Sequence, residues 1–265
     1  MAVSMTDLLA DLAAETEDLR AILAKLADAD WDRPSAAAGW LIRDQLSHLA
    51  FFDQAATLAA TEPDRFRSDT AELLQHGTAF PDVIAERHRS MPRVELAEWF
   101  DTARGRLLEV FATMDPKARI PWYGPDMSAA SSVTARLMET WAHGQDIADA
   151  VGVRRTPTAR LRNIAHLGVS TFGFAYVLNG RDVPQVPVTV RLTAPDGSQW
   201  SWGPDDAADS VTGPAEDFCL VVTQRRHRDD TALRISGPVA TEWMSIAQAF
   251  AGAPGPGRPR SGQSV

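Results

Sequence analysis

Three side chains of the types that bind divalent metals stand at informative positions in the sequence. Glu139 and His143 are one helical turn apart in LMETWAHGQDIAD, and His48 lies among apolar residues in RDQLSHLAFFD. Residues four apart project from one face of a helix, so this carboxylate and imidazole can converge on one point. A second imidazole from a facing helix would complete three ligands and leave positions open, as catalytic zinc sites require.

The same residues also have a simpler structural interpretation. A histidine on a bundle helix is more often a core or surface residue than a ligand, and the Glu–His pair can be a local contact worth about 0.2–0.5 kcal/mol. The other four histidines give weaker signals. His76, His88 and His227 lie in polar surroundings typical of a surface. His166 lies on a segment flanked by apolar residues, and we interpret it as either a structural or a pocket-lining residue.

Amphipathic helices are predicted to position the candidate ligands. Apolar residues recur at spacings of three and four from Leu8 to Leu26, and the same periodicity predicts helices over 42–60, 94–114 and 131–150. A less regular stretch containing Pro81 and Pro92 separates the second helix from the third. Four such helices with long connections predict a helical bundle, which we assign to residues 1–152.

The pattern changes after the bundle. Residues 153–251 mix helical and alternating segments, which predicts a small α+β domain that begins with a helix. Its predicted elements are a helix over 158–178, a hairpin built from VPVTVRLTA and SQWSWG around Asp196-Gly197, a helix over 214–224, a strand over 233–236 and a helix over 238–250. Residues 252–265 are rich in Pro, Gly and Arg and are predicted to be a disordered tail.

Composition excludes several classes of protein. The 265-residue chain is 45% hydrophobic and carries a formal charge of −9, which argues against binding to nucleic-acid phosphates. We find no run of 18 apolar residues and no signal-peptide pattern at the N-terminus, so we expect no membrane span and a cytoplasmic location. With 24 arginines and two lysines among its 26 basic residues, the chain is typical of a GC-rich genome.

Two further features are interpreted as structural. The lone Cys219 excludes an intrachain disulfide, and its apolar setting in EDFCLVV makes it a poor candidate for a nucleophile. Tryptophans of the bundle are interpreted as packing residues rather than a stacking platform; they are Trp31, Trp40, Trp99 and Trp141. No catalytic side chain is assigned from the sequence.

Two segments resemble the DinB-like superfamily, and in particular its branch containing mycothiol-dependent maleylpyruvate isomerase. The Trp-x-x-x-Asp-x-x-x-His pattern of that family's second helix is matched by Trp40, Asp44 and His48, with Arg43 also in its usual place. The Glu-x-Trp-x-His pattern of its fourth helix, with a following Asp, is matched by Glu139, Trp141, His143 and Asp146. The chain also resembles a less characterised sibling group that is described only as metal-binding.

The resemblance implies a mainly α fold, with a DinB-like four-helix bundle followed by a small α+β C-terminal domain. It implies that His48, Glu139 and His143 bind a divalent metal, with zinc as the expected ion. We expect their nitrogen and oxygen atoms to lie within about 4 Å of one another. Asp44 and Asp146 are candidates to orient the ligand imidazoles, and Asp44 has the alternative role of capping its own helix.

The function implied is that of a metal-dependent enzyme that binds and activates a small-molecule thiol, as an isomerase or an S-transferase. The arginine-rich composition fits actinobacteria, in which mycothiol is the dominant small thiol, so mycothiol is the expected co-substrate. The alternative is a non-catalytic metal-binding or ligand-sequestering protein, because fold does not determine function. Expected partners are a small-molecule substrate and the thiol, with neither nucleic acid nor membrane, and the chain is expected to be a monomer or a homodimer.

Overall fold

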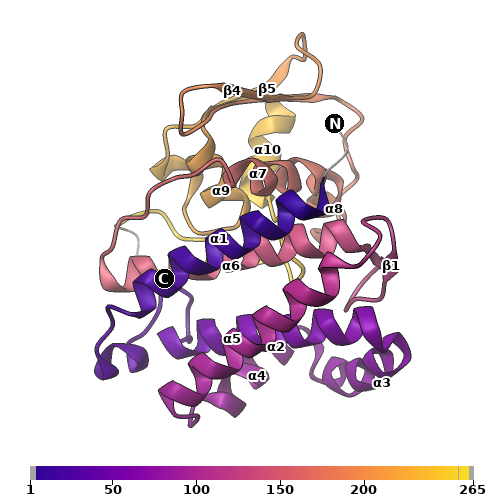
Figure 1. Ribbon diagram of the computed structural model, residues 1–265. Helices are drawn as coiled ribbons and strands as arrows, with labels where there is room; N and C mark the ends of the chain where they lie inside the picture. The colour runs from indigo at the N-terminus through magenta and orange to yellow at the C-terminus, as the bar shows by residue number, and fades with distance from the viewer. Residues whose placement is uncertain (1–3, 256, 263–265) are drawn as a thin grey trace. The chain divides into compact units, whose positions relative to one another are not determined.

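The computed structural model describes residues 4–255 and 257–262. Its contacts divide the chain into two units, Met1–Arg155 and Thr156–Val265, close to the predicted boundary after residue 152. Part of the predicted disordered tail, residues 256 and 263–265, lies outside the described residues. Each unit has its own arrangement of elements (Figure 1), and we describe the two separately.

The first unit is the predicted four-helix bundle. Its four long helices are α1 (Met5–Leu23), α2 (Ile42–Thr61), α5 (Arg93–Ala112) and α6 (Ala129–Val151). Helix α1 packs along α6, and α2 packs against both α5 and α6 (Figure 1). The arrangement therefore places the helix that carries His48 beside the helix that carries Glu139 and His143.

Apolar side chains fill the bundle on both sides of the candidate ligands. One cluster joins Leu19, Leu46, Phe100 and Ile147, and a second joins residues of the other end of the bundle, such as Leu12, Leu107, Phe111 and Leu137. These side chains are almost completely buried, and burial of one such side chain contributes about 1.5–3 kcal/mol. The bundle thus has a hydrophobic core that does not depend on a metal.

The segment expected to be irregular contains two further helices. These are α3 (Pro63–Leu73) and α4 (Phe80–His88), joined by the 3₁₀ turn η2 (Leu74–Ala79). A further 3₁₀ turn, η1 (Asp28–Asp32), lies between α1 and α2. Pro63 and Pro81 stand in the first positions of their helices, where the missing N–H costs nothing and the fixed φ favours helix. The prolines therefore begin new helices, and the expectation of irregular structure was wrong.

A buried ion pair connects the end of the bundle to its first helix. The Arg155 guanidinium, 9% exposed, contacts the carboxylate of Glu15 in α1, which is 1% exposed. It also donates a 2.8 Å hydrogen bond to the Trp141 carbonyl in α6. We call this pair the Arg155–Glu15 clamp.

The second unit is the predicted small α+β domain. A four-stranded sheet has the order β4-β3-β5-β6, with β3 and β5 parallel and the other pairs antiparallel. Its elements are α7 (Leu161–Ser170), α8 (Phe172–Leu178), β3 (Val188–Thr193), β4 (Gln199–Trp202), β5 (Asp209–Pro214), α9 (Ala215–Val222), η3 (Arg228–Asp230), β6 (Arg234–Ser236) and α10 (Pro238–Ile246). The first unit also has a two-stranded ribbon of β1 (Arg119–Ile120) and β2 (Met127–Ser128).

Two details of the second unit differ from the expectation. The helix predicted over 158–178 is divided at Thr171 into α7 and α8. Strand β5 was not predicted, because its sequence DSVTGP contains Asp, Gly and Pro, which are depleted in strands. Along the described part of the chain, no helix combines the length and the apolar character needed to cross a bilayer.

Candidate metal centre

The three residues singled out as metal ligands meet inside the bundle. The His143 Nε2 atom lies 2.9 Å from Glu139 Oε2, and the His48 Nε2 atom lies 3.5 Å from the same oxygen. One potential ligand atom from each residue falls within 4.8 Å of the others, slightly wider than the 4 Å expected. We call these three residues the His/Glu cluster.

His143 is oriented by a residue that the sequence analysis did not single out. Its Nδ1 atom contacts the Oε1 atom of Gln45 on α2, and Gln45 donates through Nε2 to Ser35 Oγ at 2.7 Å. The second bond fixes the amide so that its oxygen faces the imidazole, and Nδ1 of His143 therefore carries the proton. The other ring nitrogen, Nε2, faces Glu139.

His48 is buried without a hydrogen-bond partner. The residue is 9% exposed, and among the described residues neither of its ring nitrogens has a partner for a hydrogen bond. The pKa of His48 is lowered to about 3, mainly by burial and next by the nearby His143, while Glu139 acts in the opposite direction. The imidazole is therefore neutral at pH 7, which is the form that binds metals.

Glu139 is ionised in this setting. Burial by itself would raise its pKa, but the interactions with His143 and His48 and the charge of Arg136 outweigh burial and hold the pKa well below its usual range. Its two carboxylate oxygens face different groups: Oε2 is directed to the imidazoles, whereas Oε1 lies 3.9 Å from Arg136 Nη2.

These observations fit a bound divalent cation. His143 contacts Gln45 through Nδ1, so its Nε2 atom, 2.9 Å from Glu139 Oε2, is the nitrogen that would face a cation held by the carboxylate. The Nε2 atom of His48, which faces Glu139, likewise lacks a partner among the described residues, and a metal would supply one. Two imidazoles and one carboxylate are a ligand set suited to zinc.

Asp44 does not contact an imidazole nitrogen in this structure. It instead caps its own helix, which is the alternative role. Its Oδ2 atom accepts a 2.8 Å hydrogen bond from the Leu41 N–H at the start of α2. The same carboxylate pairs with Arg89, whose Nη2 atom lies 2.8 Å away. Since the Nδ1 atom of His48 remains unpaired, Asp44 acts on its own helix and on the segment after α4. Asp146 is fully buried on α6, and its role in orienting a ligand stays a prediction.

Two aromatic rings border the His/Glu cluster. The Trp40 ring stacks on His143 at a centroid distance of 5.9 Å, and the Phe52 ring lies 4.5 Å from that of His48. Trp40 also donates a 2.7 Å hydrogen bond to Asp82 through Nε1. The interpretation of Trp40 as a packing residue is therefore incomplete, because its ring covers a candidate ligand.

A chain of buried charges extends from the His/Glu cluster into the bundle. Arg104 Nε on α5 lies 2.7 Å from Asp53 Oδ2 on α2, and the other Asp53 oxygen lies 4.0 Å from Arg136 Nη1 on α6. Arg104 also donates a 2.9 Å bond to Thr140 Oγ1. All three charged residues are buried. The sequence analysis missed them, although each is a charged residue within the apolar stripe of a helix.

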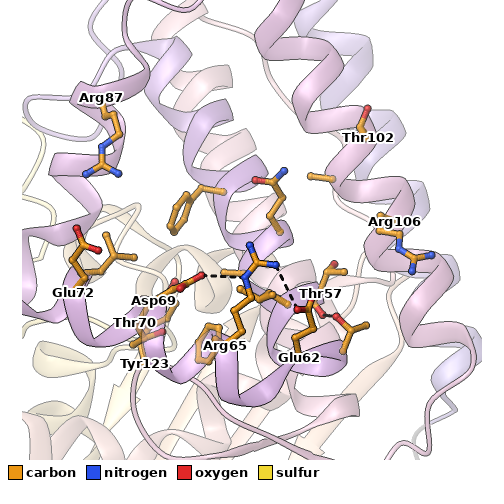
Figure 2. Close-up of a pocket in the computed structure, with 18 of the residues that line it drawn as sticks. Thr57, Glu62, Arg65, Asp69, Thr70, Glu72, Arg87, Thr102, Arg106 and Tyr123 are labelled. Carbon is orange, nitrogen blue, oxygen red and sulfur yellow. Dashed lines mark hydrogen bonds and ion pairs between the residues drawn. The ribbon is translucent and has the colours of Figure 1, made fainter.

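A separate cavity of about 680 Å³ lies elsewhere in the bundle, lined by residues of α2, α3 and α5 (Figure 2). Arg65 is one of the lining residues and pairs with Glu62 at 3.4 Å and with Asp69 at 3.8 Å, as the dashed lines show. The residues of the His/Glu cluster are not among those that line it. Phe52 stands between the two regions, since its ring contacts both His48 and the cavity residue Tyr123.

The remaining nucleophile and histidine candidates are structural. Burial, followed by the charge of Glu216, raises the pKa of the Cys219 thiol well above its usual value, so the reactive thiolate is disfavoured. His166 accepts a 3.3 Å hydrogen bond from Trp202 Nε1 in the second unit. Neither residue belongs to the His/Glu cluster.

Comparison with known proteins gives the relationships of the chain. Residues 12–148 match the family described as the mycothiol maleylpyruvate isomerase N-terminal domain, and residues 184–234 match a family described as wyosine base formation. Two uncharacterised proteins of Mycobacterium tuberculosis, from strains CDC 1551 / Oshkosh and ATCC 25618 / H37Rv, are each 47% identical over 254 residues, which is 94% of this chain and 97% of theirs.

Solved structures of similar fold include two of the mycothiol-dependent maleylpyruvate isomerase, one of them a mutant. Each has a TM-score of 0.58 and 14% sequence identity to this chain. The similarity to the mutant covers 86% of this chain and 91% of the mutant chain. The similarity to the other structure covers 88% of this chain and 93% of that chain. At this identity the likeness establishes the DinB-like fold, in agreement with the predicted fold class.

Proposed function

The chain belongs to the mycothiol maleylpyruvate isomerase N-terminal domain family, and from this premise we propose that it is a divalent-metal-dependent enzyme that uses a small-molecule thiol. His48, Glu139 and His143 would hold the metal, with zinc as the proposed ion and mycothiol as the proposed thiol. The reaction would be an isomerisation or an S-transfer on a small-molecule substrate. The observation that carries the proposal is the meeting of three ligand atoms within 4.8 Å inside the bundle.

The bound metal would supply an open position at which a thiol loses its proton and becomes the reactive thiolate. The protein's own residues support an anionic ligand at this place. The charges of Glu139 and of the buried Asp53, Arg104 and Arg136 cancel, and His48 is neutral because its pKa is lowered to about 3. A divalent cation would therefore add two uncompensated positive charges, which favours binding of a further anion.

Other residues prepare the site without taking part in proton transfer. In the metal-bound form, Gln45 would keep a proton on Nδ1 of His143 and leave Nε2 to bind the metal beside Glu139. The Trp40 and Phe52 rings cover the two imidazoles and reduce access of water, which strengthens electrostatic interactions inside the site.

Cobalt substitution tests the proposal directly. We expect Co²⁺ to bind the purified protein, and addition of a small thiol to produce a thiolate-to-cobalt charge-transfer band in the near ultraviolet. The band should be absent from His48→Ala and His143→Ala. It should persist in His166→Ala, a control that removes a histidine of the second unit with no part in the His/Glu cluster.

Three outcomes separate the alternatives. A thiol-induced band that depends on His48 and His143 supports the enzyme. Cobalt binding that thiols leave unchanged favours the non-catalytic metal-binding protein. A wild-type protein that binds no cobalt contradicts both.

A further inference from the structure

Arg136 is a buried cation to which the described residues offer no hydrogen bond of ordinary length. Its side chain is 4% exposed and lies on α6 one turn before Glu139. Its Nη1 atom is 4.0 Å from Asp53 Oδ1, and its Nη2 atom is 3.9 Å from Glu139 Oε1. Both separations exceed the range of about 2.7–3.2 Å for an N–H···O hydrogen bond. The guanidinium therefore lies between two carboxylates and is bonded closely to neither.

The surroundings hold Arg136 in this intermediate position. Its guanidinium carbon lies 5.7 Å from the centre of the Phe52 ring and 5.8 Å from that of Trp122, distances at which aromatic faces attract a cation. Asp53 is held on its other oxygen by Arg104 at 2.7 Å, so it is not free to turn toward Arg136. The position of the guanidinium is thus set from several sides.

Glu139 is consequently divided between two kinds of partner. Its Oε2 atom lies 2.9 Å from His143 Nε2 and 3.5 Å from His48 Nε2, whereas its Oε1 atom is directed to Arg136. A carboxylate that is free to rotate can offer both oxygens to one metal, but a cation beside one oxygen favours leaving that oxygen outside the metal's shell.

We propose that Arg136 is a positioning residue that retains Oε1 of Glu139, so that Glu139 binds the divalent metal through Oε2 alone. This inference rests on the proposed function, since it presupposes that the His/Glu cluster binds a metal. Its consequence is a smaller set of protein ligands around the ion. If Glu139 bound the metal through both oxygens, it would fill two coordination positions. Binding through Oε2 alone leaves one of these positions open for a ligand from outside the protein.

The relative affinity for two metals tests this role. Arg136→Met removes the cation, and Glu139 is then expected to bind through both oxygens. Manganese favours a shell with more oxygen ligands than cobalt does. The ratio of the Mn²⁺ to the Co²⁺ dissociation constant should therefore fall by at least about tenfold, the scale on which outer partners of metal ligands act. A ratio is the appropriate readout because repulsion between Arg136 and a divalent cation affects both metals alike.

The visible spectrum of the cobalt protein supplies a second readout. We expect its d–d absorption to weaken in Arg136→Met, because cobalt absorbs less strongly as its coordination number rises. Arg136→Lys keeps the charge and should restore part of both effects. Arg155→Met is the matched control, since it removes another buried arginine of the bundle, one paired with Glu15, and should leave both the ratio and the spectrum unchanged.

The outcomes are distinguishable. If Arg136→Met does not fold, Arg136→Gln serves as the second uncharged variant under the same criterion. A ratio within twofold of wild type in the folded uncharged variant overturns the positioning role and leaves the proposed function intact. A ratio that changes as much in Arg155→Met shows a general effect of stability and also overturns it. A wild-type protein that binds no cobalt overturns both.

Discussion

The two units treat their buried polar groups differently. In the second unit, Asp209 accepts a 2.8 Å hydrogen bond from the Ala240 N–H, and the buried Thr223 donates at 2.7 Å to the Cys219 carbonyl. In the bundle, buried charged side chains contact one another: Arg104 lies 2.7 Å from Asp53, and Arg136 reaches both Asp53 and Glu139 only at about 4 Å. These two buried groups of the second unit have backbone partners, whereas these buried charges of the bundle have side-chain partners.

Unpaired buried atoms sharpen the contrast. Among the described residues, those of the second unit belong to the neutral groups of Trp243 and Gln248, whereas in the bundle they include atoms of His48, Asp53 and Arg136. A buried charge with incomplete partners is costly, and such groups in native proteins call for a specific explanation. The unpaired atoms of His48, Asp53 and Arg136 lie in or beside the His/Glu cluster, where a metal and its ligands would offset part of their cost.

The largest effect is expected from Arg104→Met. Removing one partner of a buried ion pair leaves Asp53 uncompensated, so the free energy of unfolding should fall by about 3–5 kcal/mol. Urea denaturation followed by circular dichroism measures the loss. Arg106→Met on the same helix is the control, because Arg106 is 61% exposed and pairs with an exposed Glu109. Equal losses in the two variants would contradict the importance of the buried pair.

Glu139→Gln should act on metal binding more than on folding. Replacing an anionic oxygen by a neutral amide is expected to weaken metal affinity by at least about tenfold. The metal-free protein should melt at a somewhat lower temperature, because the amide keeps the size of the side chain but loses the charge interactions that hold the Glu139 pKa low. Metal titration paired with a thermal melt measures both quantities. Glu62→Gln, which alters a carboxylate in the separate cavity, should leave metal affinity unchanged; a similar loss there would contradict the assignment.

Asp209→Ala is expected to have a smaller and local effect in the second unit. The lost hydrogen bond to the Ala240 N–H near the start of α10 resembles the loss of a helix cap, which costs about 0.5–2 kcal/mol. Hydrogen exchange of α10 amides measures the change. Asp209→Asn retains an acceptor oxygen and should lose less. A loss larger than that of Arg104→Met would reverse the comparison between the units.

Chelation of the metal is expected to have the smallest structural effect. The bundle keeps its apolar clusters around residues such as Leu46 and Leu107 without an ion. Far-UV circular dichroism should therefore keep nearly all of its helical signal in the presence of a chelator, while thiol-dependent activity is lost. Complete unfolding in chelator would indicate a structural metal instead.

Periodicity was sufficient to predict the helices that carry the candidate site. The expected ranges 42–60 and 131–150 agree with α2 and α6 to within about two residues, because the apolar stripe of each faces the core. The juxtaposition of His48 with Glu139 and His143 also followed from the sequence, since the motifs place them on facing helices. Their role as metal ligands stays a prediction.

Side-chain partners across the bundle could not be predicted in the same way. The contact of Gln45 with His143 and that of Asp53 with Arg104 join residues that are 98 and 51 positions apart, and their formation depends on helix rotation, which a single periodic pattern does not specify. Asp44 differs, because both roles considered for it, capping its own helix and orienting an imidazole, involve local groups. The structure has the cap. Strand β5 was missed because tertiary pairing with β3 overrides its weak strand propensity.

The Arg155–Glu15 clamp has a consequence for how the protein is made. It joins residues 140 positions apart, and α1 packs along α6, so the first helix lacks its native contacts with α6 and Arg155 until the whole bundle segment has been synthesised. At about 5–20 residues per second, ribosomes need about 8–30 s to reach Arg155. During that interval the apolar face of α1 remains uncovered on the nascent chain, and closure of the bundle must follow translation of its last helix.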